Sequence, residues 1–159
     1  MAMQWHPAKQ TRSMSPDWAT KYVGIPYLSL GRTREGCDCW GLVRLVYAEH
    51  FSIDLPSFKE AYESANDVVD VSGAIEVERN SERWKSGWVE VESPAPGDVI
   101  LCRVMGYETH VGVFAGAGLM LHVLKGTDAC IVNINSMMWR RRIVGYFRQS
   151  VGMPSPKSL

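Results

Sequence analysis

The stretch that decides the fold reads DCWGLVRLVY and runs from Asp38 to Tyr47. From Leu42 onward its apolar residues recur at helical spacing, so the pattern predicts an amphipathic helix. Asp38 is a favourable N-cap, which puts Cys39 at the first helical position on the same apolar stripe. We therefore expect the Cys39 thiol to face the sheet, with the helix dipole and free backbone N–H groups favouring its thiolate form.

The segments on either side of this helix differ in pattern. Toward the N-terminus, Ser15 followed by Pro16 predicts the start of a short helix, with Ser15 as its cap. Residues 59–84 are polar and predict helical structure. From Trp88 onward the alternation of apolar residues predicts strands at Trp88–Val91, Val99–Val104, His110–Phe114, Leu119–Leu124, Ala129–Asn133 and Ile143–Phe147. Helices first and strands afterwards favour an α+β fold, with N-terminal helices packed on a central antiparallel sheet.

Composition limits the classes of function. The 159 residues predict one domain over 1–159, with a core at 15–150 and a helical, polar insertion at 59–87. The 17 basic and 17 acidic residues balance, which argues against partners held by charge alone, so we expect no nucleic acid. The longest apolar stretch, Val111–Leu124, is shorter than the roughly 20 residues that cross a bilayer. We expect no membrane insertion, and synthesis in the cytoplasm without a signal peptide.

Two histidines flank a predicted hairpin turn. With a three-residue turn at Ala115–Ala117, His110 and His122 face each other directly, with Cβ atoms about 4.5–5.5 Å apart. A cysteine nucleophile needs a base within hydrogen-bond reach and a third group that orients the base. Cys39, His110 and His122 fit these roles in that order, so the pattern predicts a cysteine peptidase.

Other interpretations of the cysteines and of one basic run stay open. Cys39 alone is also compatible with a small core residue. A zinc site would draw on two thiols and two imidazoles, from Cys37, Cys39, His110 and His122. The Cys-x-Cys spacing is not the usual one for zinc, and we expect neither a metal nor a cofactor. Cys102 and Cys130 are interpreted as structural, and residues 139–142 as a solvated charged turn.

Six short segments form a more specific pattern when they are taken together. In chain order they are G-x-P-Y at 24–27, D-C-W-G-L-V at 38–43, L-P at 55–56, P-G-D-V-I at 96–100, H-V-G-V-F at 110–114 and L-H at 121–122. This combination resembles the NlpC-like cell-wall cysteine peptidases, a branch of the papain-like superfamily. The resemblance spans about Trp18 to Arg148 and implies the papain-like NlpC fold.

The resemblance implies a role for each site residue. Cys39 would be the nucleophile, His110 the base and His122 the orienting residue. Tyr27 would lie near the oxyanion, and Asp38 would help to hold the free amine of the substrate. Such enzymes typically cleave peptidoglycan stem peptides, often between D-glutamate and a diamino acid. The family usually has Ser after the nucleophile, and here Trp40 alters the wall of the pocket beside Asp38.

The D-C-W-G variant and the long polar stretch before Trp84 resemble family members from phage tail tips. This implies a peptidoglycan hydrolase associated with a phage or prophage tail, with tail proteins as partners. It would travel in the virion tail and act in the periplasm or cell wall. Two other functions stay open: a catalytically silent structural or interaction component of a phage tail, and an amidase or acyltransferase on the same fold.

Overall fold

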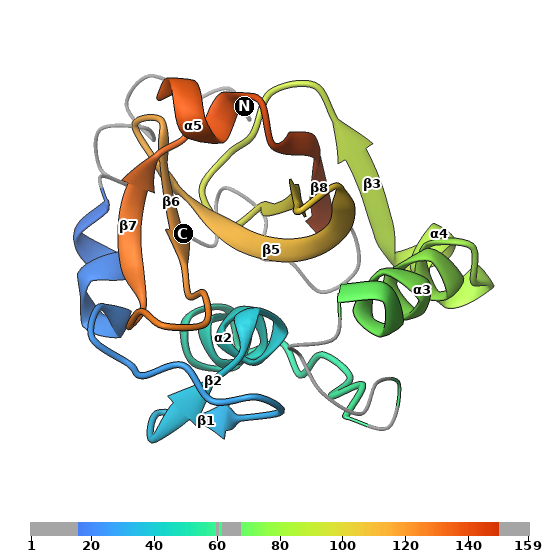
Figure 1. Ribbon diagram of the computed structural model, residues 1–159, viewed down its shortest axis with the longest axis horizontal. Coiled ribbons are helices and arrows are strands. Elements are labelled where there is room, and N and C mark those ends of the chain that lie inside the picture. The colour runs from blue at the N-terminus through green and yellow to red at the C-terminus, as the bar shows by residue number, and fades with distance from the viewer. Residues whose placement is uncertain (1–15, 60, 62–67, 150–159) are drawn as a thin grey trace, which may run out of the picture.

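The computed structural model describes residues 16–59, 61 and 68–149 of the chain. Figure 1 shows a curved sheet with helix α2 on one side and the short helix α5 on the other. The elements before the sheet are η2 (Pro16–Tyr22), β1 (Arg32–Thr33), β2 (Gly36–Cys37), α2 (Cys39–Val46), η3 (Tyr47–Phe51), α3 (Val68–Arg79) and α4 (Glu82–Gly87). They are followed by β3 (Trp88–Val91), β4 (Val99–Val104), β5 (Tyr107–Gly116), β6 (Leu119–His122), β7 (Cys130–Asn133), α5 (Met137–Arg140) and β8 (Ile143–Gln149).

Strands β3 to β8 form one antiparallel sheet in the order β3-β8-β4-β5-β6-β7. The predicted α+β fold, with helices on a central antiparallel sheet, is confirmed. β3 and β4 have the predicted bounds, whereas β5 is longer than predicted and β6 ends at His122. Ser15, the predicted cap of the first helix, lies outside the described residues, as do residues 60 and 62–67 of the predicted insertion. None of the described helices is long and apolar enough to cross a membrane.

The β5–β6 hairpin differs from the prediction in both its turn and its register. Gly116 pairs with Leu119, so the turn has two residues, Ala117 and Gly118, with φ angles of 54° and 75°. Positive φ at both central residues is typical of the tight hairpin turn whose twist matches that of the strands. The register shifts between Phe114 and Gly116, which leaves one extra residue as a bulge in β5.

This bulge changes how the two predicted site histidines are related. Val113 pairs with Leu121, and continuing that register places His122 opposite Gly112. The direct opposition of His110 and His122 is therefore wrong, and they are diagonal neighbours on one face of the sheet. Gly112 suits this place, because an added Cβ would lie 2.6 Å from the side chain of Met120.

The sheet carries a hydrophobic cluster on each face. On the α2 face, Leu42, Val43 and Val46 of the helix are buried with alternate residues of β4 and β5, such as Val111. The other face holds a smaller cluster that α5 covers with Trp139. Strand alternation explains the division, because successive side chains of β5 point to opposite faces. The helical stripe predicted for α2 is confirmed.

Helices α3 and α4 form the described part of the polar insertion. Figure 1 shows them beside the end of the sheet, next to α2 in this view. Arg79 at the end of α3 forms an ion pair with Glu108 of β5 at 2.7 Å. Trp84 of α4 stacks on Trp88 of β3, with ring centroids 4.8 Å apart. The ion pair fixes the end of α3 to β5, and the stacked rings fix α4 to β3.

Candidate active site

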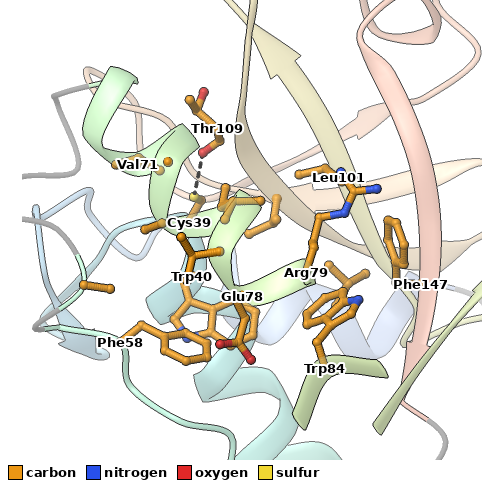
Figure 2. A pocket seen from close by; sticks show the side chains of 17 residues that line it. Cys39, Trp40, Phe58, Val71, Glu78, Arg79, Trp84, Leu101, Thr109 and Phe147 are labelled. Atoms are coloured by element: carbon orange, nitrogen blue, oxygen red, sulfur yellow. Dashed lines mark hydrogen bonds between the residues drawn. The ribbon is translucent and has the colours of Figure 1, made fainter. Parts of the chain in front are cut away.

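Cys39 is the first residue of α2 and directly follows its cap. The Asp38 carboxylate accepts a hydrogen bond from the Gly41 N–H at 2.8 Å, so the predicted N-cap is confirmed. The Cys39 thiol lies against β5, where Sγ is 3.8 Å from the carbonyl oxygen of Thr109 (Figure 2). The predicted orientation of this thiol toward the sheet is therefore confirmed.

The surroundings of the Cys39 thiol favour its protonated form. Burial raises the pKa of the thiol to about 12, and the neighbouring Asp38 carboxylate acts in the same direction. Hydrogen bonds from the backbone of Val111 and Trp40 oppose this rise with a smaller effect. The expected stabilisation of the thiolate is thus wrong for this structure, because lost hydration outweighs the helix terminus.

The imidazole rings of His110 and His122 meet directly. His110 Nε2 and His122 Nδ1 are 2.9 Å apart, and the ring planes cross at 78°. Both side chains are buried, at 2% and 3% exposure. The association that the sequence predicts is present, although it arises from diagonal neighbours on the two strands.

Trp139 of α5 covers this histidine pair. Its ring centroid lies 4.7 Å from that of His122 and 5.9 Å from that of His110. Burial lowers the pKa of His122 to about 4, and burial together with the nearby His122 and Arg142 lowers the pKa of His110 to about 3. Both rings are therefore neutral at pH 7. The prediction that 139–142 is a solvated turn is wrong for Trp139, which is buried.

The thiol and the histidine pair are not in hydrogen-bond contact. The Cys39 thiol meets the backbone on either side of His110, at Thr109 and Val111, and the structure gives it no hydrogen bond to the imidazole ring. Val111 packs in the α2 cluster, so His110, one residue earlier on β5, points toward α5. The structure thus joins two of the three predicted residues and places the third across the same strand.

Asp38 is fully engaged inside the protein. Its carboxylate forms a 2.7 Å ion pair with Arg32 and accepts hydrogen bonds from the N–H groups of Gly41 and Leu30. The side chains of Asp38 and Arg32 are 1% and 8% exposed. Asp38 therefore caps the helix and balances a buried guanidinium, and the structure does not support its expected role in holding a substrate amine.

Tyr27 and Trp40 differ in how the structure relates them to Cys39. Burial, with smaller contributions from the Cys39 and Asp38 groups, raises the pKa of the Tyr27 phenol to about 12, so the phenol is neutral at pH 7. Trp40 donates from Nε1 to the Pro56 carbonyl oxygen at 2.8 Å, and its ring faces the pocket beside Cys39 (Figure 2). Trp40 therefore lines the pocket, and the substrate-binding roles expected for Tyr27 and Trp40 stay predictions.

The four residues of the zinc alternative do not converge. The Cys37 thiol is buried and donates to the carbonyl oxygen of Thr33 at 3.0 Å, away from the histidines. Within the part of the chain that the structure describes, no three His, Cys, Asp or Glu side chains are grouped in a way that would hold a metal ion.

Sequence patterns gave no indication of two residues next to the histidines. Cys130 Sγ lies 3.6 Å from His122 Nε2, because β7 pairs Cys130 with His122. Trp139 lies in α5, whose N-cap is Ser136. A serine cap can be recognised in the sequence, but the three arginines after Trp139 favoured the interpretation as a solvated turn. The Cys130 contact depends on the pairing of β6 with β7, and the Trp139 contact depends on α5 packing against the sheet. No local sequence pattern predicts either one.

Most of the chain resembles known proteins in sequence. The model of the NlpC/P60 family matches residues 24–148. The chain is 29% identical over 135 residues to Gamma-DL-glutamyl hydrolase of Bacillus subtilis, covering 82% of this chain and 27% of that protein. It is 26% identical over 131 residues to Murein DD-endopeptidase MepS/Murein LD-carboxypeptidase of Escherichia coli K12, covering 82% of this chain and 59% of that protein. The chain thus spans between a quarter and three fifths of these relatives.

Solved structures share the fold. An NlpC/P60 family protein from Bacillus cereus superposes with a TM-score of 0.58 at 22% identity, covering 94% of this chain and 41% of that chain. The NlpC/p60 domain of the peptidoglycan hydrolase SagA gives a TM-score of 0.54 at 18% identity, covering 91% of this chain and all of that domain. With the motif residues arranged on this fold, the chain belongs to the NlpC/P60 family of cysteine peptidases.

Proposed function

We propose that the protein is a cysteine endopeptidase that hydrolyses peptidoglycan stem peptides at a D-glutamyl–diamino acid type of bond. Its membership of the NlpC/P60 family carries this proposal. Two relatives support it by name, one as a γ-DL-glutamyl hydrolase and the other as a murein endopeptidase. The Cys39 thiol and the His110 ring lie at the two faces of the same strand, β5, and the contact with His122 gives the proposed base an orienting partner.

In the proposed reaction the Cys39 sulfur attacks the peptide carbonyl carbon, and the thiol proton passes to His110. The C–N bond then breaks as His110 protonates the leaving amine, and water activated by His110 cleaves the thioester. His122 orients the His110 ring. The Cys39 N–H at the helix start and the Tyr27 hydroxyl are the proposed oxyanion donors.

The deciding experiment is mass spectrometry of muropeptides after incubation with the wild-type protein and Cys39→Ala. We expect Cys39→Ala to lose turnover on the order of 10⁴-fold while its fold, measured by circular dichroism, persists. Cys37→Ala is the matched control, since that thiol faces Thr33. Wall peptide digestion by Cys39→Ala at the wild-type rate would show that the nucleophile is wrong.

A catalytically silent module is the second candidate. The absence of a hydrogen bond between the Cys39 thiol and the His110 ring favours it. It predicts no new muropeptides from the wild-type protein at any pH.

We further propose that the protein is carried in a phage or prophage tail and acts in the periplasm or cell wall, with tail proteins as partners. The D-C-W-G segment at 38–41 and the polar insertion before Trp84 support this by resemblance. Immunoblots of purified virions test it, and a protein found only in the lysate, never with tails, would contradict it.

A further inference from the structure

A cavity of about 700 Å³ opens directly beside Cys39. Helix α3 forms one wall, strands β4 and β5 form the floor, and the rings of Trp40, Phe58 and Trp84 line its ends (Figure 2). Its volume lies within the roughly 300–1,000 Å³ of pockets that bind small ligands. Cys39 is one of the lining residues, so a molecule in the cavity can contact the candidate nucleophile.

The lining of this cavity is almost entirely apolar. Its charged and hydroxyl side chains are Glu78, Arg79 and Thr109. Arg79 pairs with Glu108 at 2.7 Å, and the Thr109 hydroxyl donates to the carbonyl oxygen of Tyr107. The remaining lining is mostly aliphatic and aromatic, from residues such as Val71 and Phe147, and offers a ligand few hydrogen-bond partners.

This lining favours one chemical class of ligand. A peptide has an amide N–H and a carbonyl at every residue, and burying these groups without partners is unfavourable. A saturated hydrocarbon chain has no such groups and gains free energy from every buried methylene. The carbonyl carbon that Cys39 would attack has to lie at the end of this hydrocarbon chain, within reach of the thiol. A hydrocarbon chain that ends in a carbonyl is an acyl group.

We propose that the cavity binds an aliphatic acyl chain and that Cys39 removes this chain from an ester. This rests on Cys39 being the nucleophile of the proposed function and adds a substrate class to it. The Cys39 sulfur bonds to the ester carbonyl carbon, the C–O bond breaks, and the alcohol leaves with the thiol proton. Water then cleaves the thioester, which releases the carboxylic acid and restores the thiol.

The test uses 4-nitrophenyl acetate, butyrate and octanoate, with the rate of Cys39→Ala subtracted. Burial of methylenes predicts that kcat/KM rises about fourfold for each added CH₂ until the cavity is full. We therefore expect octanoate to exceed acetate by at least 100-fold. Equal kcat/KM for the three esters overturns the proposal.

Two variants that fill the cavity test whether the acyl chain binds there. Ala74→Phe places a ring in the cavity from α3, and Gly73→Leu adds a side chain where a Cβ meets nothing within 4 Å. Each should lower octanoate turnover at least 10-fold more than it lowers acetate turnover. Ala48→Phe, on an exposed part of η3, is the matched control. If both variants turn over octanoate at the wild-type rate, the acyl chain does not bind in this cavity, and the proposal is overturned.

Muropeptide digestion by the same preparation separates this inference from the proposed function. Digestion without any chain-length preference refutes the acyl site alone. A chain-length preference that depends on Cys39, without digestion of wall peptides, refutes the peptidase and keeps the acyl site.

A different contact carries a second inference, about proton positions in the histidine pair. His110 can accept the thiol proton only at Nδ1, because its Nε2 faces His122 Nδ1 at 2.9 Å. His110 Nε2 then carries a hydrogen and donates to His122 Nδ1. The hydrogen of His122 is consequently on Nε2, which lies 3.6 Å from Cys130 Sγ.

The geometry points to Cys130 as a positioning residue that accepts the His122 Nε2–H hydrogen bond and thereby fixes both tautomers. Nitrogen-15 NMR of the histidines should show the hydrogen of His122 on Nε2 in the wild-type protein. Cys130→Ala should allow the other tautomer and lower kcat roughly 3- to 10-fold with KM unchanged, because a histidine in the wrong tautomer is a poor base. Cys130→Ser should recover part of kcat, and Val132→Ala on the same strand should change neither signal. Wild-type His122 with its hydrogen on Nδ1 overturns the assignment.

Discussion

The two halves of the candidate site differ in how completely the fold assembles them. His110 and His122 are buried, share a 2.9 Å contact and lie against Trp139. Cys39 lies across β5 beside an apolar cavity, and its thiol meets backbone groups of Thr109, Val111 and Trp40. The contact that orients the proposed base is therefore formed in the structure, whereas the contact between nucleophile and base is not.

The largest expected effect comes from substitutions in the histidine pair. His110→Ala removes the proposed base, and we expect muropeptide turnover to fall on the order of 10³- to 10⁴-fold. His122→Ala removes only the orienting contact, and should cost roughly 10- to 100-fold. Single-turnover assays with purified stem peptide measure both losses. Equal losses for the two variants would contradict their different roles.

The next effect concerns the ion pair beneath the nucleophile. Arg32→Gln leaves the buried Asp38 carboxylate without its 2.7 Å partner, and breaking a buried pair costs about 3–5 kcal/mol. Urea unfolding at pH 7 measures the lost free energy of unfolding. Arg34→Gln, which breaks the exposed pair with Glu49, is the matched control and should cost below about 1 kcal/mol. A similar, small loss for both variants would show that Asp38 is not held as described.

Acid should weaken the histidine half selectively. Burial lowers the pKa of His122 to about 4, so the native state binds fewer protons than the unfolded chain below about pH 6.5. The stability due to the neutral ring is present above pH 6.5 and is lost as the pH falls toward 4, by about 1.4 kcal/mol per pH unit. Urea unfolding from pH 7 to 5 should show this loss, and His122→Gln should reduce its slope. An unchanged slope in His122→Gln would contradict the buried neutral ring.

The smallest expected effect concerns the reactivity of the Cys39 thiol. Burial raises the pKa of the Cys39 thiol to about 12, so its alkylation by iodoacetamide should be slow at pH 7 and rise continuously through pH 9. The measurement uses Cys130→Ser, which removes the other partly exposed thiol. A rate that levels off below pH 8.5 would mean that the thiol is ionised in the free protein, as expected from the helix start alone.

Local signals in the sequence predicted much of the fold. The Asp38 cap and the apolar stripe of α2 are short-range patterns, and the alternation in β3 and β4 gave their bounds without error. Capping and strand periodicity depend on neighbouring residues, so a single sequence contains them. The association of His110 with His122 followed from the same periodicity.

The remainder of the site depends on contacts between distant segments. Arg32 neutralises Asp38 across a loop, and Trp139 returns from the far end of the chain to cover the histidines. Neither contact has a spacing rule. The raised pKa of Cys39 also depends on distant segments. The hydration of the thiol is set by the surface that α3 and β5 form around it, which the helix start alone does not indicate.

The single bulge at Ala115 decides on which face of the sheet His122 lies. The turn pairs Gly116 with Leu119, and without the extra residue Val113 would pair with His122. His122 would then point toward α2 with Val113, and its ring would leave His110. A one-residue insertion or deletion in the paired part of β6 would therefore separate the two histidines even if every side chain were kept. The number of residues between the turn and His122 is thus as much a part of the site as the histidines themselves.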